Sequence, residues 1–429
     1  MNILISAVGT TDPISHNRDA ALLHIARTYR PEQIVLVYSE EMLIKQDLIE
    51  KAIFSIEDYH PEVMIESTIL KNDEVYLFDK MYEVMGQIVE KYSGTDHQLI
   101  LNLSSGTPQI ISALFALNRI KDYNTQAIQV ATPNKSANRQ YVPLSSEGEQ
   151  KLFNENEDNQ KDYEDRTIKD EAEKFNQSLI KRHLRNLIAS YDYLAAEEFV
   201  TKKEYNNLLS KKKLSFLRAT LNDFVKVFKT QAILKDIQDY PLTDVEKKAL
   251  NYFLMIEVLK ERGQVADVLI KSKSYVEFII EEKIKKDYPD LIKYDGALPK
   301  LNEEYKDFEK ILDFIDLEFK KAKGIENEEE RIYSPQSTLN LLSYENILTF
   351  YQASPDLMKS LKVITSLNSE RNKVAHGLSE IDGKLVNSKK LQQTIDTLRF
   401  VLQDTFNIED HYFGYYQKIN DKLLDLLRS

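Results

Sequence analysis

The stretch QLILNLSSGTPQ, residues 98–109, is a short apolar run that ends in a polar turn containing one glycine. The chain begins in the same way, with MNILISAVGTTDP at residues 1–13. Both runs are almost wholly apolar, which is typical of parallel strands that are covered on both faces. The two segments therefore predict buried strands whose carboxyl ends lead into small polar loops.

The rest of the first 150 residues alternates between short apolar runs and amphipathic stretches of helical length. Five strands are expected, at residues 2–8, 34–39, 64–70, 98–103 and 125–132. Four helices are expected between them, near residues 17–29, 41–59, 73–92 and 108–122. This alternation predicts an α/β domain with a Rossmann-like parallel sheet and helices on both faces.

The remainder of the chain reads differently. Residues 151–175 are polar and strongly charged, and we interpret them as a linker or connecting helix. Residues 176–429 show apolar side chains at helical spacing, for example Leu391, Ile395, Leu398 and Leu402. The expected organisation is an α/β domain at residues 1–150, the linker, and an all-α region at 176–429. The pattern leaves open whether the middle helices, to about residue 330, form a domain of their own.

Composition narrows the class of protein. The 429 residues suffice for two or three domains, and the absence of cysteine excludes disulfides, thiolate metal sites and cysteine nucleophiles. The chain starts without a basic leader and contains no apolar run of the roughly 18–20 residues that span a bilayer. We therefore expect a cytoplasmic protein that does not contact a membrane.

The charge balance bears on nucleic-acid binding. The net charge is −12, with 12 basic against 20 acidic residues in the first 150 and 45 against 49 in the rest. Neither part has the basic face of a DNA-binding domain, so DNA is not an expected partner. Any nucleic-acid chemistry must be local.

The two polar loops are candidates for ligand contact, since open parallel sheets bind ligands at the carboxyl ends of their strands. Each loop offers a glycine that lets a ligand approach the backbone, followed by hydroxyl side chains: Gly9, Thr10 and Thr11 in the first, and Ser105, Gly106 and Thr107 in the second. Thr107 is placed to cap a helix that starts at Pro108, and a helix N-terminus favours phosphate. The alternative is two ordinary tight turns. The chain has neither G-x-G-x-x-G nor the Walker pattern.

A second constellation lies late in the chain, in Arg371-Asn372-x-x-x-His376. On a helix, Asn372 and His376 share a face. Histidine transfers protons near neutral pH, and arginine stabilises the negative charge of a phosphorane, so the pair suits metal-free RNA cleavage with Asn372 as an orienting group. The alternative is a histidine at a helix end beside Gly377. No two of the seven histidines have metal-ligand spacing, so no metal site is expected.

The Arg371–His376 motif resembles the R-x4–6-H signature of HEPN ribonuclease domains, and the front loops resemble those of CARF domains. Their order and the chain length are similar to the CRISPR type III-associated CARF–HEPN ribonucleases. The resemblance implies a homodimer that a cyclic oligoadenylate activates, with six adenylates favoured over four. Single-stranded RNA would be cut without a metal ion or other cofactor, as part of antiviral defence, at a composite site to which each copy contributes one motif.

The resemblance also assigns residues. It implies catalytic roles for Arg371, Asn372 and His376 and ligand contact for Gly9, Thr10, Thr11, Asn102, Ser105, Gly106 and Thr107. Some CARF domains slowly cleave their own activator, and Asn102 and Thr107 are the candidates for that activity here. One feature departs from the pattern, because the acidic helical region has no obvious basic channel for RNA.

Three alternatives remain. The first is a cyclic-oligonucleotide sensor whose helical half only dimerises or recruits a partner. The second is a transcriptional regulator, which would need a basic recognition helix that the sequence does not offer. The third is a dinucleotide or nucleotide-sugar enzyme, which would need phosphate-binding glycines that the chain lacks.

Overall fold

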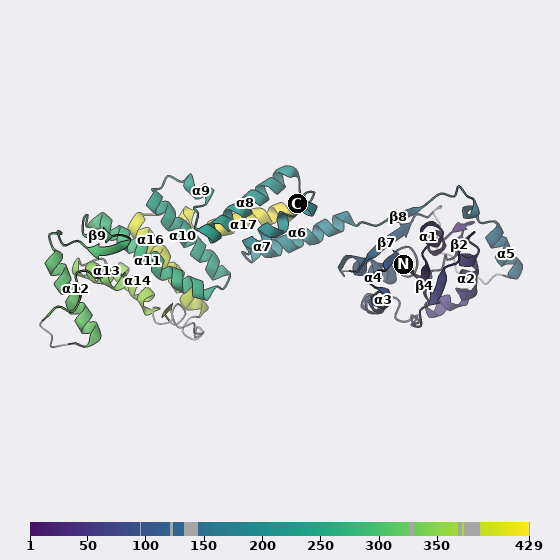
Figure 1. The fold of residues 1–429 in the computed structure, drawn as a ribbon, viewed down its shortest axis with the longest axis horizontal. Helices are drawn as coiled ribbons and strands as arrows, with labels where there is room; N and C mark the ends of the chain where they lie inside the picture. The colour runs from purple at the N-terminus through teal and green to yellow at the C-terminus, as the bar shows by residue number, and fades with distance from the viewer. Residues whose placement is uncertain are drawn as a thin grey trace. The chain divides into compact units, whose positions relative to one another are not determined.

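The computed structural model describes residues 1–94, 96–120, 123–132, 145–325, 330–367, 371–372 and 387–428. The chain divides into two compact units, Met1–Asn176 and Gln177–Ser429 (Figure 1). Each unit has its own buried core. No helix among the described residues has both the length and the apolar character that a membrane crossing requires.

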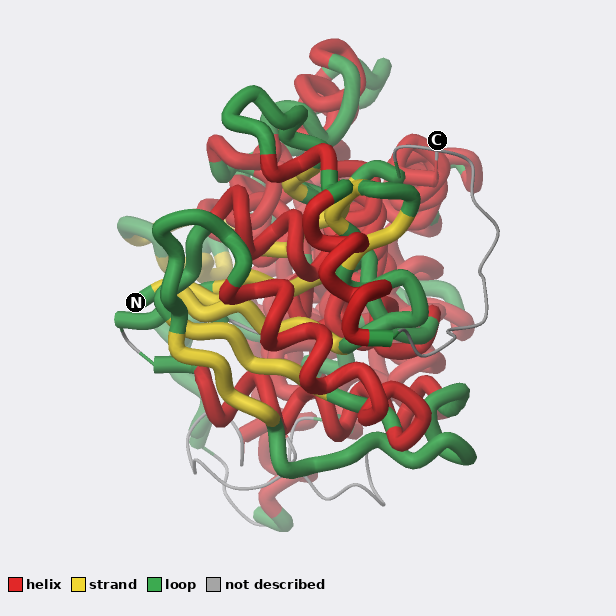
Figure 2. The backbone as a smooth tube through the Cα atoms, turned by 90° about the vertical axis from the view of Figure 1, so that its right-hand side faces the viewer, coloured by secondary structure: helices red, strands yellow, loops and turns green. Residues whose placement is uncertain are grey.

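The first unit is built on a six-stranded sheet, whose strands lie next to one another in Figure 2. In spatial order they are β5 (Glu62–Ile65), β4 (Gln33–Val37), β1 (Asn2–Ala7), β6 (Gln98–Asn102), β7 (Thr125–Val130) and β8 (Thr167–Lys169). Neighbouring strands are parallel except β7 and β8, which are antiparallel. All five predicted strands are present, and four lie within two residues of their expected bounds. The strand expected at residues 64–70 lies earlier, at Glu62–Ile65, and overlaps the expected range by only two residues.

Helices cover both faces of this sheet, because successive side chains of the central strand point to opposite sides. Ile3 and Ile5 of β1 are buried in the same cluster as residues of α3 (Phe78–Tyr92) and α4 (Pro108–Ile120). Leu4 is buried with residues of α1 (Ala21–Tyr29) and α2 (Gln46–Phe54) on the other face. The predicted parallel sheet with helices on both faces is therefore confirmed.

The charged segment at residues 151–175 belongs to the first unit. It contains the end of α5 (Ser146–Asn154), the short helix η2 (Glu157–Asn159), the edge strand β8 and the first residues of the next helix. Strand β8 has the sequence Thr-Ile-Lys and is mostly exposed, so it carries none of the apolar pattern by which the other strands are recognisable. Its place in the sheet comes from backbone pairing with β7.

The second unit is helical, as predicted. Its helices are α6 (Glu173–Ala189), α7 (Tyr193–Val200), α8 (Lys211–Thr230), α9 (Lys235–Gln238), α10 (Asp244–Glu261), α11 (Val265–Asp287), α12 (Phe308–Lys323), α13 (Leu341–Phe350), α14 (Pro355–Ser366), α16 (Ser388–Phe406) and α17 (Tyr415–Arg428). One continuous cluster of buried side chains runs from Leu184 to Leu427. The middle helices therefore share a core with the last ones.

A small hairpin interrupts this helical unit. Strands β9 (Ile292–Asp295) and β10 (Leu298–Leu301) pair antiparallel across a two-residue turn, in which Gly296 has a φ of 60°. A positive φ at this position suits a tight hairpin turn and favours glycine. The hairpin was not expected from the sequence.

Candidate functional site

The two glycine-containing loops meet at the carboxyl ends of β1 and β6, which are adjacent parallel strands. After β1 the sheet continues to one side through β4, and after β6 it continues to the other side through β7, so the loops lie at the topological switch point where such sheets bind ligands. A Cβ atom on Gly9 would lie 3.1 Å from the backbone nitrogen of Gly106. The two loops are thus in direct backbone contact.

Gly106 is required at this crossing for two reasons. Its φ is +101°, a conformation that side chains with a Cβ rarely adopt. A Cβ there would also lie 3.0 Å from the Cβ of Ala7 at the end of β1. The glycine therefore allows the second loop to cross the first at close range.

A buried lysine holds the first loop in place. Lys45 ends the short helix η1 (Glu40–Lys45) and is 1% exposed. Its ammonium donates hydrogen bonds to the carbonyl oxygens of Gly9 at 3.2 Å, Thr10 at 2.7 Å and Asp12 at 2.7 Å. Burial lowers the pKa of Lys45, and the nearby Asp12 carboxylate opposes that shift. The loop is thus wrapped around a single cation.

The Asp12 side chain completes this arrangement from the other side. Its carboxylate accepts hydrogen bonds from the backbone N–H of Gly9 at 2.8 Å and of Leu22 at 3.3 Å. Burial raises the pKa of Asp12, while the hydrogen bonds and Lys45 work against that rise. Since the Gly9 amide is already engaged, it is not one of the free amides that the loop offers to a ligand.

Thr10 and Thr11 form the outer part of the first loop. Thr10 is exposed and Thr11 half-buried. Within the described residues, their hydroxyls and backbone N–H groups have no hydrogen-bond partner. These groups are donors that an anion at the sheet edge can use.

The second loop is fixed by the side chain of Asn102, which is fully buried at the end of β6. Its amide nitrogen donates to the Ser6 hydroxyl at 2.9 Å, and its oxygen accepts from the Ser104 N–H at 2.8 Å. The Ser104 hydroxyl in turn accepts from the N–H of Val130 at 2.8 Å. Asn102 thus uses both polar ends of its side chain inside the protein.

Ser105 and Thr107 occupy different positions in this loop. The Ser105 hydroxyl oxygen is buried near Asp12, whose pKa it helps to lower, but it has no partner in good hydrogen-bond geometry among the described residues. Thr107 accepts from the N–H of Ile110 at 3.4 Å, as expected for the cap of α4, and donates to the carbonyl of Val75 at 3.0 Å. Pro108 is the first residue of that helix.

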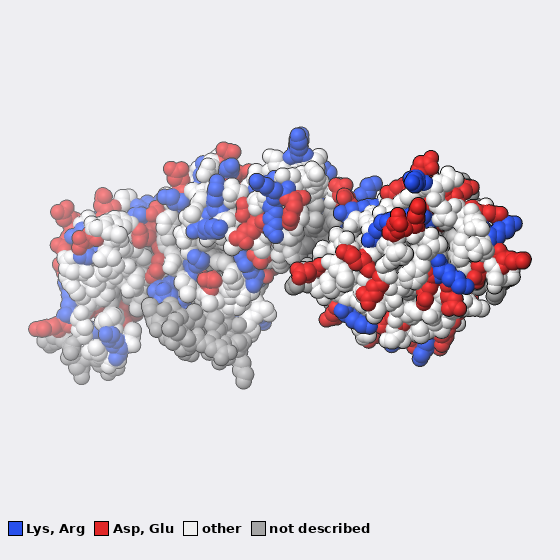
Figure 3. All heavy atoms as spheres, turned by 45° about the vertical axis from the view of Figure 1, so that its right-hand side comes forward, with Lys and Arg blue, Asp and Glu red and all other residues white. Residues whose placement is uncertain are grey.

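The charges of the first unit support binding through amides and hydroxyls. Figure 3 shows acidic and basic side chains interspersed over the visible face of this unit. The loop residues themselves carry no exposed cation, because Lys45 is buried under its three carbonyls. An anion at this edge would be held by backbone and hydroxyl dipoles.

The Arg371 motif follows α14. Arg371 and Asn372 have helical backbone, and the Arg371 N–H donates to the carbonyl of Leu367 at 2.9 Å. Arg371 Nη1 donates to Asn372 Oδ1 at 3.0 Å, so these two side chains are in contact. His376 lies outside the described residues. Helices α14 and α16 flank the motif in the chain, and both pack on α11.

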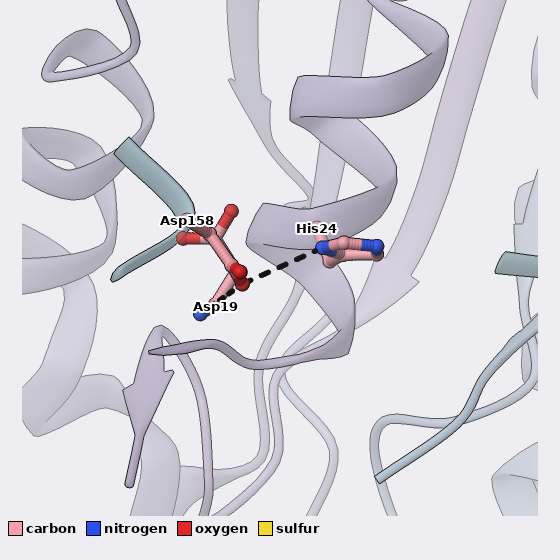
Figure 4. Close-up of side chains that lie close together, drawn as sticks. All are labelled: Asp19, His24 and Asp158. Atoms are coloured by element: carbon pink, nitrogen blue, oxygen red, sulfur yellow. Dashed lines mark hydrogen bonds and ion pairs between the residues drawn. The ribbon is translucent and has the colours of Figure 1, made fainter. Parts of the chain in front are cut away.

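A further cluster of acidic side chains and histidine lies in the first unit, at Asp19, His24 and Asp158 (Figure 4). One ligand-type atom from each lies within 4.8 Å of the others. Arginines already pair with both carboxylates: Arg27 Nε with Asp19 at 2.5 Å, and Arg166 Nη2 with Asp158 at 2.6 Å. The arrangement is that of a buried ionic network.

This network anchors the segment that leads out of the sheet. His24 Nε2 accepts a hydrogen bond from the backbone N–H of Arg166 at 2.9 Å, and His24 Nδ1 lies 3.2 Å from Arg166 Nη2 and 3.7 Å from the Asp158 carboxylate. Burial works to raise the pKa of Asp158, but hydrogen bonds from His24 and the Asp19 backbone, with Arg166, lower it to about 2. Residues 156–166 are thereby tied to α1.

The sequence analysis named the loop residues as candidates but did not identify the side chains that hold the loops in place. Lys45 was expected within a helix near residues 41–59, and Asp12 carried no assigned role. The roles of Lys45 and Asp12 become apparent only in the folded chain, where the ends of β1 and β6 lie side by side.

Comparison with known protein families agrees with both units. Residues 62–167 match the Cas_Csm6 CARF domain, and residues 228–424 match the Cas_Csm6 HEPN domain. A CRISPR system endoribonuclease Csm6 of Streptococcus thermophilus is 64% identical over 427 residues, covering 100% of both chains. A second protein of that species, CRISPR system endoribonuclease Csm6', is 35% identical over 429 residues with the same coverage.

A solved structure has the same fold. Enterococcus italicus Csm6 bound to cyclic hexa-2'-fluoro-hexa-dAMP aligns with a TM-score of 0.71 and 26% identity, covering 99% of this chain and 100% of that one. With two matched domains in the predicted order and relatives similar along their whole length, the chain belongs to the Csm6 family.

Proposed function

We propose that the chain is an endoribonuclease of type III CRISPR antiviral defence, which cuts single-stranded RNA without a metal ion when a cyclic oligoadenylate binds its CARF unit. The observation that carries the sensing half is the contact between the Gly9 and Gly106 loops at the switch point. The cutting half rests on the Arg371–Asn372 pair within the segment matched by the HEPN family model.

The activator contacts follow from the loop geometry. Thr10 and Thr11 offer unpartnered hydroxyls and amides, and Gly9 and Gly106 let the two loops cross closely enough to lie at the same edge of the sheet. Ser105 and Thr107 lie beside them in the second loop. We assign Asn102 to positioning, since its side chain holds Ser6 and Ser104. A ring of six adenylates is favoured over four, in keeping with the hexameric analogue bound to the Enterococcus italicus protein.

The proposed reaction is internal transfer at phosphorus. The ribose 2'-oxygen loses a proton and attacks the adjacent phosphorus, and the 5'-oxygen leaves and gains a proton. His376 transfers a proton, Arg371 stabilises the charge that grows on the phosphorane oxygens, and Asn372 orients Arg371 through their hydrogen bond. Two proton transfers need two groups, so a homodimer with one motif from each copy provides a complete set.

Slow cleavage of the activator is the second part of the proposal. Thr107 is the residue nearest to this role, although its hydroxyl now donates to the Val75 carbonyl and must exchange that bond to reach a ribose. Incubation of the ring with protein, followed by chromatography, tests it. Thr107→Val should leave the ring intact for longer than wild type.

The decisive experiment uses a fluorogenic single-stranded RNA in EDTA, with and without cyclic tetra- and hexa-adenylate. We expect cleavage that requires the hexa-adenylate, survives EDTA and disappears in His376→Ala. A variant that still binds the ring but fails to cut separates the two sites. Tight ring binding with no cleavage by wild type would instead support a non-catalytic sensor.

A further inference from the structure

The second unit contains a cavity that none of the assigned roles uses. Its volume is about 480 Å³, within the range of small-ligand sites. The lining residues are Thr230, Gln231, Ile233, Lys248, Asn251, Tyr252, Ser274, Tyr275 and Phe278. They come from the end of α8 and the residues just after it, the first half of α10 and the middle of α11.

The aromatic wall of this cavity contains two parallel tyrosine rings. The rings of Tyr252 and Tyr275 are parallel to within 4°, with centroids 6.0 Å apart. Tyr275 is 2% exposed, and its buried hydroxyl has no hydrogen-bond partner in the described chain. A buried hydroxyl without a partner is rare in a folded interior.

The charges at the cavity are positive. Lys248 is the charged residue among the described lining residues, and it is exposed without an ion pair. The ammonium of Lys271 lies 5.7 Å from the centre of the Tyr252 ring. In a chain of net charge −12, a cavity lined by a cation and no carboxylate selects for an anion.

Several lining groups are already committed and define what is left for a ligand. Asn251 accepts from the Leu234 N–H at 3.1 Å and donates to the Ala232 carbonyl at 3.1 Å, so it shapes the wall. The side chains of Gln231 and Ser274 are exposed and have no partner within the described residues. The free chemistry is therefore a flat aromatic surface, one amide, one hydroxyl and a cation.

We propose that this cavity binds one nucleotide of the single-stranded RNA substrate, with the base against Tyr252 and the phosphate beside Lys248. Stacking on an aromatic ring and a lysine–phosphate contact are the features of sequence-tolerant single-strand binding. The cavity also provides a local binding site for RNA in a unit whose sequence shows no broad basic face. Helix α11 lines the cavity and packs on α14 and α16, which flank the Arg371 motif.

This inference rests on the proposed ribonuclease function, and its test has one arm that needs cleavage and one that does not. In the first arm, Tyr252→Leu and Lys248→Gln are assayed for activator-stimulated RNA cleavage. We expect KM to rise by about tenfold with kcat unchanged, as loss of one stacked base or one phosphate contact predicts. Tyr252→Phe keeps the ring and should retain the wild-type KM.

The second arm measures binding of a fluorescent 2'-O-methyl oligonucleotide, which cannot be cleaved, to the full chain. Phe216→Leu and Lys422→Gln serve as matched controls, because both side chains are exposed in the same unit but do not line the cavity. We expect the two cavity variants to weaken binding by about tenfold and the controls to leave it unchanged. If wild type binds this oligonucleotide through the cavity but cuts no RNA, the ribonuclease proposal fails and the site stands.

Competition with adenosine monophosphate separates the two sources of a nucleotide. Displacement of the oligonucleotide only at far higher mononucleotide concentration supports RNA as the ligand. Tight binding of the mononucleotide with no binding of the oligonucleotide overturns that source. Unchanged KM and unchanged oligonucleotide binding in both cavity variants, with folding verified by circular dichroism, overturn the proposal.

Discussion

Replacing Lys45 with methionine tests whether the buried cation holds the activator loop. Methionine keeps most of the apolar stem and removes the ammonium, which donates to the carbonyls of Gly9, Thr10 and Asp12. Hydrogen bonds from a charged group each contribute about 1.5–3 kcal/mol. Part of this gain is offset by the desolvation of the ammonium, which burial of Lys45 makes unfavourable.

The net cost is estimated from the carbonyls that are left without a donor. An unsatisfied buried polar group costs about 1–3 kcal/mol, and removal of the ammonium leaves three carbonyls to find other partners. We expect the first unit to lose about 3 kcal/mol of unfolding free energy. For a unit of this size that loss lowers the melting temperature by roughly 6–12 °C.

The assay combines calorimetry of the full chain with measurement of RNA cleavage as a function of cyclic oligoadenylate concentration. The transition of the first unit should move down in Lys45→Met, and the ring concentration for half-maximal RNA cleavage should rise by at least about tenfold. Lys51→Met is the matched control on the adjoining helix, where an exposed lysine pairs with Glu149 at 2.9 Å. A surface pair of this kind contributes little, so this variant should behave as wild type.

Two results would refute the reasoning in different ways. An unchanged transition in Lys45→Met would mean that the three hydrogen bonds contribute no net stability. A lowered transition with unchanged half-maximal ring concentration would mean that the loop from Gly9 to Asp12 does not contact the activator.

Three further predictions concern single residues. Gly106→Ala forces a Cβ into a backbone with a φ of +101°, a strain of about 1–3 kcal/mol, and should raise the cyclic oligoadenylate concentration for half-maximal RNA cleavage about ten- to a hundredfold. The control is Gly86→Ala, whose Cβ would have its nearest neighbour at 3.5 Å and which should leave this concentration unchanged. Equal concentrations for the two variants would contradict the crossing of the loops. Burial raises the pKa of Glu257 to about 7, so the native state holds this proton more tightly than the unfolded chain, and the free energy of unfolding should fall as pH rises from about 4.3 to 7. Urea unfolding at pH 5 and pH 8 should show that Glu257→Gln reduces this loss of stability. An identical loss in the variant and the wild type would exclude Glu257 as its source. Arg371→Lys keeps the charge but not the planar donors, so kcat for RNA should drop about a hundredfold while ring binding, measured by calorimetry, stays the same; a kcat near wild type would remove Arg371 from the reaction.

Several features of this protein follow from its sequence alone. The apolar runs at β1, β4 and β6 have few stable environments other than a sheet covered on both faces, so the α/β architecture of the first unit was predictable. The cap of α4 was also predictable, because Thr107 and Pro108 act on the backbone that immediately follows them. Local chemistry of this kind depends on neighbours in the chain.

Other features depended on contacts between distant segments. Strand β8 is polar and three residues long, and only pairing with β7 makes it a strand. Lys45 lies more than thirty positions from the carbonyls that it binds, and Arg166 lies 142 positions from His24. A buried charge is stable only when other groups of the fold bond to it, and here those groups are distant in the sequence, so no local pattern predicts them. The sequence by itself therefore determined the elements, the two-unit order and the loops that offer a site, while the tertiary structure decided which buried charges hold those loops in place.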